Sequence, residues 1–237
     1  MKAQRAPSDT QTSDQSQQRI GHRLSKFSAA WSEISPDPWV LKTVSEGYRI
    51  PFVQPPPLQE RPRFHPTYPQ GSPKWEALSL AVNNMLDKGA IEPAPLSPGF
   101  YSRLFLVPKS DGDWSSVIDL SALNTSVDCP SFVMETPRSI LRALSQGQWL
   151  ISLDLKDAYI HVGIHPTSRP FLWFCHNGQV WQFISLPFGL STRPRVFTKV
   201  LKLVLAYAHL HWVRLHMYLD DCLLNPDSRQ EALGQTS

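Results

Sequence analysis

Apolar and polar positions follow two different periodicities along this chain. Between residues 74 and 88, tryptophan and aliphatic residues recur at helical intervals, and Gly89 is a plausible stop signal, so this segment is predicted to be a helix. Beyond Pro98 the pattern changes to short apolar runs around Asp-Gly and Asn-Gly turn signals at 111–112 and 177–178. This order, helices first and then strands mixed with helices, predicts an α+β fold.

Further elements are predicted from the same apolar runs and helix breakers. Prolines 36 and 38 divide the apolar residues of 21–50 into two short helices. Asp220 and Asp221 occupy the turn between the last two strands. The other expected helices are 137–144 and 192–208, and the expected strands are 101–107, 114–118, 149–153, 169–174, 180–184, 212–218 and 222–224, of which 149–153 is expected to be buried.

Composition divides the chain into three parts. Residues 1–20 are rich in Gln, Ser and Thr, and they hold too few apolar residues to offset the entropy of ordering, so we expect a disordered tail. Residues 21–73 form an N-terminal helical and proline-rich segment, in which 51–73 is expected to be an extended linker or a strap across a surface. Residues 74–237 carry the mixed helices and strands. Proline, with 22 residues, is nearly twice as frequent as the usual ~5%, which excludes a helical bundle, a coiled coil and a tight repeat array.

Charge, cysteine content and hydropathy exclude several classes of protein. The net charge of +3 is too weak to indicate a nucleic-acid binder by itself. The three cysteines are widely spaced, so neither a disulfide framework nor a zinc site is expected, and a reducing compartment fits best. The longest apolar stretch, 200–219, is interrupted by Lys, Arg and His, and the N-terminus lacks the apolar core of a signal peptide. We therefore expect no membrane span and an intracellular protein, cytoplasmic or nuclear and not secreted.

Three short blocks carry candidate chemistry: Ser152–Tyr159 (SLDLKDAY), Leu186–Leu190 (LPFGL) and Tyr218–Asp221 (YLDD). Asp154 is predicted to end a buried strand, while Asp220 and Asp221 lie in a hairpin turn. If these elements are neighbours in one sheet, three carboxylates converge on one edge, where they can bind hard divalent cations such as Mg²⁺. Two such ions support phosphoryl transfer. The alternative is that these aspartates only cap turns, as isolated Asp residues commonly do.

The three blocks, in this order, resemble motifs A, B and C of retroelement reverse transcriptases. Upstream, VPKSDGDW at 107–114 and VIDLSALN at 117–124 resemble the fingers hairpin of that family and the strand after it. The wording of PRVFTKVL at 194–201 and of LDLKDAYIHVGIHP at 153–166 is most similar to DIRS-like retrotransposons, with gypsy-like elements second. The resemblance implies a right-hand polymerase fold, with fingers and an antiparallel palm sheet backed by helices.

The resemblance also assigns roles to individual residues. It implies that Asp154 and Asp220 are the catalytic metal ligands and that Asp221 completes the carboxylate cluster. The implied cofactors are two Mg²⁺ ions, or Mn²⁺. The implied nucleotide-binding residues are Lys109 on the fingers, Asp157 and Ala158 through their backbone, Tyr159 beneath the incoming sugar, and Phe188 and Gly189 in the loop against nucleotide and template.

The implied activity is RNA-directed DNA synthesis. Its partners are an RNA or DNA template with primer and deoxynucleoside triphosphates, and a parent element of this family usually also carries ribonuclease H. Basic residues on the predicted helix 192–208, namely Arg195, Lys199 and Lys202, would suit a phosphate backbone, although they could equally keep that helix soluble.

Three features depart from the family pattern. Ser115 stands where the family usually has an arginine that binds the triphosphate. Arg193 stands where a small residue is usual, so its side chain either points inward and blocks the nucleotide pocket or points outward. Only 16 residues follow Asp221, so we expect the thumb to be missing and a partner chain to supply it if the chain is active. Two hypotheses therefore remain: a reverse transcriptase domain, or a catalytically inactive retroelement remnant that at most binds nucleic acid.

Overall fold

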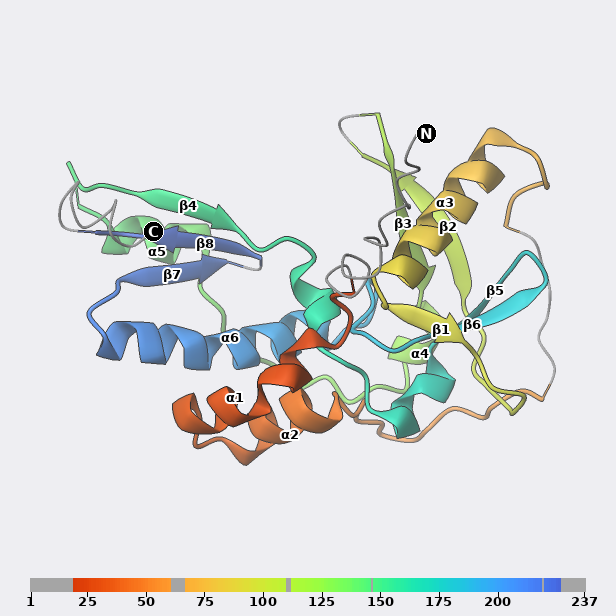
Figure 1. Cartoon of the computed structure of the whole chain (residues 1–237), viewed down its shortest axis with the longest axis horizontal. Helices are drawn as coiled ribbons and strands as arrows, with labels where there is room; N and C mark the ends of the chain where they lie inside the picture. The colour runs from red at the N-terminus through yellow and green to blue at the C-terminus, as the bar shows by residue number, and fades with distance from the viewer. Residues whose placement is uncertain (1–18, 61–66, 110–111, 146, 219, 227–237) are drawn as a thin grey trace, which may run out of the picture.

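A computed structural model describes residues 19–60, 67–109, 112–145, 147–218 and 220–226. Its elements, in chain order (Figure 1), are η1 Arg23–Phe27, α1 Ser28–Ile34, α2 Pro38–Glu46, α3 Pro73–Asp87, β1 Ile91–Pro93, β2 Arg103–Pro108, β3 Trp114–Asp119, α4 Ser121–Asn124, α5 Pro137–Ala143, β4 Ile151–Asp154, η2 Ala158–His161, η3 Pro166–Phe171, β5 Trp173–His176, β6 Gln179–Phe183, α6 Arg193–Leu210, β7 Leu215–Tyr218 and β8 Asp221–Leu224.

The described strands form three small antiparallel sheets. Their orders are β1-β6-β5, β2-β3 and β4-β8-β7. In Figure 1 the sheet β4-β8-β7 lies at one end of the molecule above α6, and the β2-β3 hairpin and α3 lie at the other. Helices α1 and α2 lie against the side of α6 away from that sheet, where Trp31, Val40, Val44 and Val200 form a small buried cluster. The α+β class is confirmed.

The main hydrophobic core lies around β5 and extends to the start of α6. Trp173 and Phe174 of β5 are almost completely buried, at 1% and 0% exposed. The same core includes Tyr159 from the first chemical block and Phe197 from α6. The core thus joins the β2-β3 half of the molecule to the segment that follows β4, and it fixes the position of both relative to α6.

Several predicted elements are confirmed because strong local signals define them. Helix α3 begins after Ser72, whose hydroxyl accepts from the backbone N–H of Trp75, and Pro73 suits the first helical position. Helix α6 begins one residue after the predicted start of 192–208 and extends two residues beyond its predicted end, and the β2-β3 hairpin forms where the Asp-Gly signal placed it. The two helices within 21–50 also form, preceded by the short η1.

Other predictions were wrong. The strand expected at 149–153 is β4, four residues long, and it is not buried: Leu153 is 42% exposed, because β4 is an edge strand of its sheet. The strand expected from 169 to 174 begins only at Trp173. Residues 166–171 form η3 instead, since Pro166 starts that turn and Pro170 has no N–H for a sheet ladder. Strand β1 and the short helix α4 were not predicted, because three or four residues carry no readable period. A disordered tail was expected at residues 1–20, and of these residues 1–18 lie outside the part of the chain that the structure describes.

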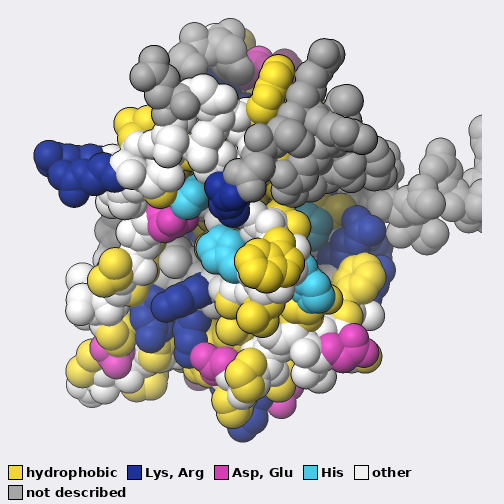
Figure 2. Space-filling view, turned by 90° about the vertical axis from the view of Figure 1, so that its left-hand side faces the viewer, with side chains coloured by type: hydrophobic (Ala, Val, Ile, Leu, Met, Phe, Trp, Pro, Cys, Tyr) yellow, Lys and Arg dark blue, Asp and Glu magenta, His cyan; other side chains and the backbone are white. Residues whose placement is uncertain are grey.

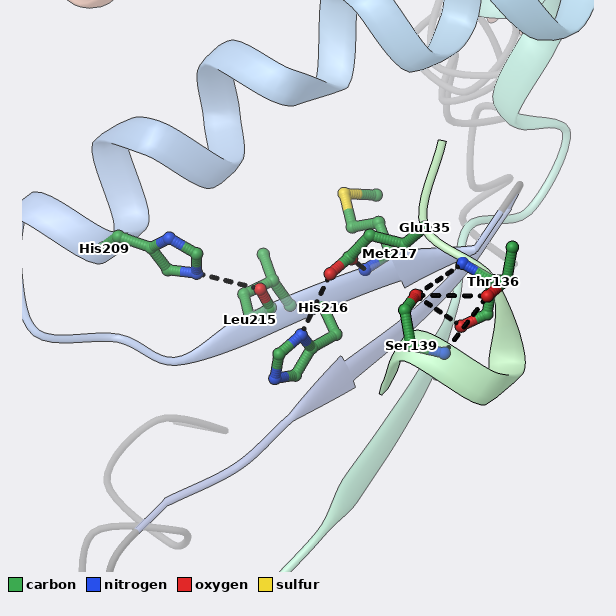
Figure 3. Close-up of polar contacts among 7 residues, drawn as sticks. All are labelled: Glu135, Thr136, Ser139, His209, Leu215, His216 and Met217. Atoms are coloured by element: carbon green, nitrogen blue, oxygen red, sulfur yellow. Dashed lines mark hydrogen bonds and ion pairs between the residues drawn. The ribbon is translucent and has the colours of Figure 1, made fainter. Parts of the chain in front are cut away.

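The strand β7 is the other edge of the sheet, and a carboxylate covers part of it (Figure 3). The Glu135 side chain accepts a hydrogen bond of 2.8 Å from the backbone N–H of Met217, and its other oxygen lies 3.2 Å from Nδ1 of His216. Thr136, the next residue, caps α5 by accepting from the backbone N–H of Ser139. Glu135 therefore gives an edge N–H a partner and ties α5 to the sheet.

We expect Glu135→Ala to lower the free energy of unfolding by about 1–3 kcal/mol, because it leaves the N–H of the buried Met217 without its acceptor. Urea unfolding of the purified chain measures this change. The matched control is Glu135→Gln, which keeps an acceptor oxygen and should cost clearly less. Equal losses for the two variants would contradict the role of the oxygen.

At the end of this sheet opposite the β7-β8 turn, histidine, apolar and basic side chains lie on the surface (Figure 2). A cleft of about 440 Å³ there is lined mainly by His209, Trp212, Arg214, His216 and Asn225. The Nε2 of His209 donates to the carbonyl of Leu215 at 2.9 Å (Figure 3). Because β7 runs from this end toward the turn that holds Asp220, the cleft is separate from the predicted site.

Among the described residues, no helix is long and apolar enough to cross a membrane.

Candidate functional site

The carboxylates of the first and third blocks come together through strand pairing. Strands β4 and β8 are antiparallel, and their register places Asp154 directly opposite Asp221. Residues directly opposite in an antiparallel pair project from the same face, so both carboxylates share one face at the end of the sheet. Asp220 lies in the turn before β8, where its carbonyl accepts a hydrogen bond of 3.0 Å from the N–H of Leu155. All three predicted aspartates therefore lie at one end of one sheet.

The buried thiol of Cys222, the residue after Asp221 in β8, lies within reach of the charges of this pair. Burial raises the pKa of the Cys222 thiol, and the nearby negative charges of Asp221 and Asp154 raise it further. Asp220, in contrast, acts on Tyr159: burial raises the pKa of that hydroxyl, Arg193 opposes the shift, and the Asp220 charge adds to it. The charge of Asp220 therefore reaches the Tyr159 hydroxyl.

The donor set fits a hard divalent cation that keeps part of its water. Within the part of the chain that the structure describes, no group of three or more His, Cys, Asp or Glu side chains is placed to hold a metal ion. The expected convergence of three carboxylates is thus reduced to the opposed pair Asp154 and Asp221, with Asp220 beside them in the turn. Mg²⁺ typically takes one or two carboxylates together with water and substrate phosphates, so one or two of these three aspartates suffice for this ion.

A cleft of about 360 Å³ opens between the β2-β3 hairpin, α3 and the LPFGL loop. Of the predicted nucleotide-binding residues, Lys109, Asp157 and Phe188 line it, as does Ser115. Ala158 and Tyr159, both buried, and Gly189 are not among its lining residues. The structure therefore brings fingers and palm residues of the prediction to one cleft, but not all of them.

Lys88 is a cleft residue that was not predicted from the sequence. Its ammonium group lies 2.7 Å from the Asp157 carboxylate, and both residues line the cleft. The Asp157 backbone has a positive φ of 55°, which directs the chain into η2. The ion pair thus connects the end of α3 to the first chemical block. No sequence signal beyond its position before Gly89 points to Lys88, since the contact spans 69 residues.

The LPFGL loop is held from the β3 side by Asn124. The Asn124 amide donates to the carbonyl of Gly189 at 2.8 Å, and its oxygen accepts from the N–H of Ser191 at 2.9 Å. Gly189 has φ +90°, and a Cβ at that position would lie 2.5 Å from the carbonyl oxygen of Ile118. Only glycine fits this close approach without strain. Asn124 lies in the segment that resembles the family, but its bracing role depends on the tertiary contact.

We expect Asn124→Ala to loosen the loop, because two hydrogen bonds of about 0.5–1.5 kcal/mol each are lost. Hydrogen exchange of the backbone amides of 186–191 should become faster, while exchange in α3 stays unchanged. Asn83→Ala, at an exposed position on α3, is the matched control. Unchanged protection of the loop in Asn124→Ala would contradict the bracing role.

Arg193, the first residue of α6, covers the ring of Tyr159. The centre of its guanidinium lies 3.5 Å from the ring centroid of Tyr159 and 3.7 Å from that of Phe188. Tyr159 also contacts Phe197, with ring centroids 4.4 Å apart, and is only 8% exposed. Burial lowers the pKa of Arg193 to about 10, although Tyr159 and Asp220 favour its charged form. Of the two positions open to this side chain, inward or outward, the structure has the inward one.

Two of the three basic residues predicted to contact nucleic acid have partners within the chain. Lys199 forms an ion pair of 3.1 Å with Asp37, and its ammonium lies 4.2 Å from the ring centroid of Trp39. Arg195 lies at 6.0 Å from the same ring. Both residues therefore tie α6 to α2, which favours a structural role for them, while Lys202 is exposed.

Aspartates opposed at the end of the β4-β8-β7 sheet, together with a separate cleft between the hairpin and the LPFGL loop, are the arrangement expected of the polymerase class of folds. Residues 107–236, more than half of the chain, match the family described as reverse transcriptase (RNA-dependent DNA polymerase). The chain belongs to this family.

Its similar proteins are polyproteins of viruses and transposons. The chain is 29% identical over 168 residues to the Gag-Pro-Pol polyprotein of squirrel monkey retrovirus, a match that covers 67% of this chain and 9% of the relative. It is 25% identical over 175 residues to the Pro-Pol polyprotein of simian foamy virus type 3 (strain LK3), covering 73% and 15%. It is 23% identical over 171 residues to the retrovirus-related Pol polyprotein from transposon 412 of Drosophila melanogaster, covering 70% and 14%. The chain thus spans a small part of these relatives.

Solved structures support the same fold. The prototype foamy virus protease-reverse transcriptase matches with a TM-score of 0.58 and 23% identity, over 76% of this chain and 24% of that one. A foamy viral protease-reverse transcriptase in complex with double-stranded DNA matches with a TM-score of 0.58 and 18% identity, over 79% and 31%. The right-hand arrangement of fingers and palm expected from the motifs is confirmed at the level of the fold.

Proposed function

We propose that this chain is the RNA-directed DNA polymerase domain of a retroelement polyprotein. The observation that carries the proposal is the register of β4 and β8, which sets Asp154 opposite Asp221 beside the turn that holds Asp220. The family membership and the cleft lined by Lys109 and by Asp157 of the first block support it. The substrates are deoxynucleoside triphosphates and a primer annealed to an RNA or DNA template.

Asp154 and Asp220 would hold the divalent ions, Mg²⁺ or Mn²⁺, and Asp221 would add negative charge beside them. When bound, such ions lower the pKa of an attacking hydroxyl and neutralise charge on the phosphates. The primer 3′-hydroxyl attacks the α-phosphorus, the bond to the bridging oxygen of the β-phosphate breaks, and pyrophosphate leaves. The aspartates orient the primer end and substrate phosphates against each other at the end of the sheet.

The cleft residues would position the nucleotide. Lys109 and Lys88 both line the cleft and would supply positive charge for the triphosphate, where Ser115 supplies none. The backbone of Asp157 and Ala158 would contact the phosphates, and Tyr159 would lie beneath the sugar. Phe188 and Gly189 would contact the nucleotide and template from the LPFGL loop, which Asn124 braces.

The assignment to a subtype of retroelement rests on the amino-acid sequences of two motifs. PRVFTKVL and LDLKDAYIHVGIHP favour a DIRS-like element, with gypsy-like elements second. Such a parent polyprotein would also carry ribonuclease H and would act inside the cell. Within this chain, residues 1–20 would be a disordered segment, 21–73 the helical and proline-rich segment, and 74–237 the fingers and palm.

Primer extension tests the proposal. The full chain is incubated with a DNA primer on an RNA template, deoxynucleotides and Mg²⁺ or Mn²⁺, beside Asp154→Asn. We expect extension by the parent and none by the variant. If the parent and the Arg193→Ala variant are both folded and neither extends the primer with either ion, the proposal is contradicted and the chain is an inactive remnant.

A further inference from the structure

The guanidinium of Arg193 occupies the space over the Tyr159 ring. It lies between Tyr159 and Phe188, at 3.5 and 3.7 Å from their ring centroids. Tyr159 is left 8% exposed, whereas Phe188, on the outer side, is 50% exposed. A planar cation between two rings makes favourable cation–π contacts with both. The ring surface of Tyr159 is therefore not open to a ligand in this arrangement.

This position is unfavourable for Arg193 in three respects. Burial disfavours its charge and lowers its pKa to about 10. Its Nε is buried and has no hydrogen-bond partner among the residues that the structure describes. Arg193 is also the first residue of α6, where the positive end of the helix dipole repels a cation. The two rings and the charge of Asp220 offset these costs.

We propose that Arg193 is a plug of the nucleotide site: it covers the ring on which the sugar of the incoming nucleotide would lie, so that nucleotide binds only when the guanidinium leaves the Tyr159–Phe188 pair. This inference rests on the proposed function, since that function assigns Tyr159 to the sugar. The half-exposed Phe188 forms the outer wall of the stack, which gives the long arginine side chain a route to solvent.

Because a nucleotide must displace this stack, its apparent affinity equals its intrinsic affinity multiplied by the fraction of chains in which Arg193 has left the two rings. Removing the side chain removes that competition. The direction of the change in nucleotide affinity distinguishes a plug from a second role, in which Arg193 itself binds the triphosphate. In that case the removal of the guanidinium would weaken nucleotide binding.

The test measures the affinity of the full chain for a fluorescent deoxynucleotide in the presence of Mg²⁺. We expect Arg193→Ala to bind the nucleotide at least tenfold more tightly than the parent, corresponding to a difference of about 1.4 kcal/mol. Arg193→Ser serves as a second small variant in case alanine perturbs the start of α6. Arg138→Ala, at an exposed position on α5, is the control with the same loss of charge. Circular dichroism and thermal unfolding verify that all chains are folded.

Equal or weaker affinity in both folded Arg193 variants would overturn the plug. Primer extension with the same chains separates this result from a failure of the proposed function. Tighter binding without extension would support the plug and contradict the polymerase assignment. Extension by parent and variants with the same KM for the nucleotide would overturn the plug and leave the polymerase assignment standing.

Discussion

Replacing Asp220 by asparagine is expected to lower the rate of nucleotide addition by about 10³-fold while the chain stays folded. Asparagine keeps the size of the side chain but removes its charge, and therefore its ability to hold a divalent ion beside Asp154. The fold should persist because the contact that fixes this turn is made by the backbone carbonyl of Asp220 with the N–H of Leu155.

Single-nucleotide addition under single-turnover conditions measures this effect. It is compared in the parent chain and in the Arg193→Ala background, so that a covered Tyr159 does not hide the chemistry. Glu33→Gln, on the exposed side of α1, is the matched control and should behave as the parent. A rate in Asp220→Asn equal to that of the parent would exclude Asp220 from the metal site.

The second large effect concerns stability. We expect Trp173→Ala to lower the free energy of unfolding by about 3–5 kcal/mol, because it leaves a cavity in the main core. Trp173 is 1% exposed, and its indole N–H donates to the Gln182 side chain at 2.9 Å. The loss also leaves Gln182, itself buried, without one of its partners.

Urea unfolding of Trp173→Ala and Trp212→Ala gives a matched comparison of the same substitution at two positions. Trp212 is 89% exposed, so its loss should change the free energy of unfolding by no more than about 0.5 kcal/mol. Similar losses for the two variants would contradict the placement of the core around β5.

The sequence predicted those elements whose signals are local. Helix α3 is marked by its period and by Ser72 and Pro73, and the β2-β3 hairpin is marked by its Asp-Gly turn. The burial of β4 was predicted wrongly, because an apolar run does not reveal whether its strand lies at an edge. The strand β1 depends on its pairing with β6, some 90 residues away in the chain, and no local pattern encodes that.

The site likewise contains residues that the sequence revealed and residues whose roles depend on distant contacts. The three aspartates could be found from motif spacing, and the β4-β8 register places them at one sheet end. The roles of Lys88 and Asn124 could not be predicted, because each depends on a contact with a distant segment. The inward position of Arg193 also depends on packing: its sequence position allows the side chain to point in or out, and the two aromatic rings decide between them.

We propose that Asp154 and Asp220 bind divalent ions at the end of this sheet, and Mn²⁺ binding followed by electron paramagnetic resonance tests this most directly. The full chain is titrated with Mn²⁺ beside Asp154→Asn, Asp220→Asn and the control Glu33→Gln. We predict saturable Mn²⁺ binding to the parent and the control, competed by Mg²⁺, and its loss in both aspartate variants. Binding that is unchanged in Asp154→Asn and Asp220→Asn would contradict the account.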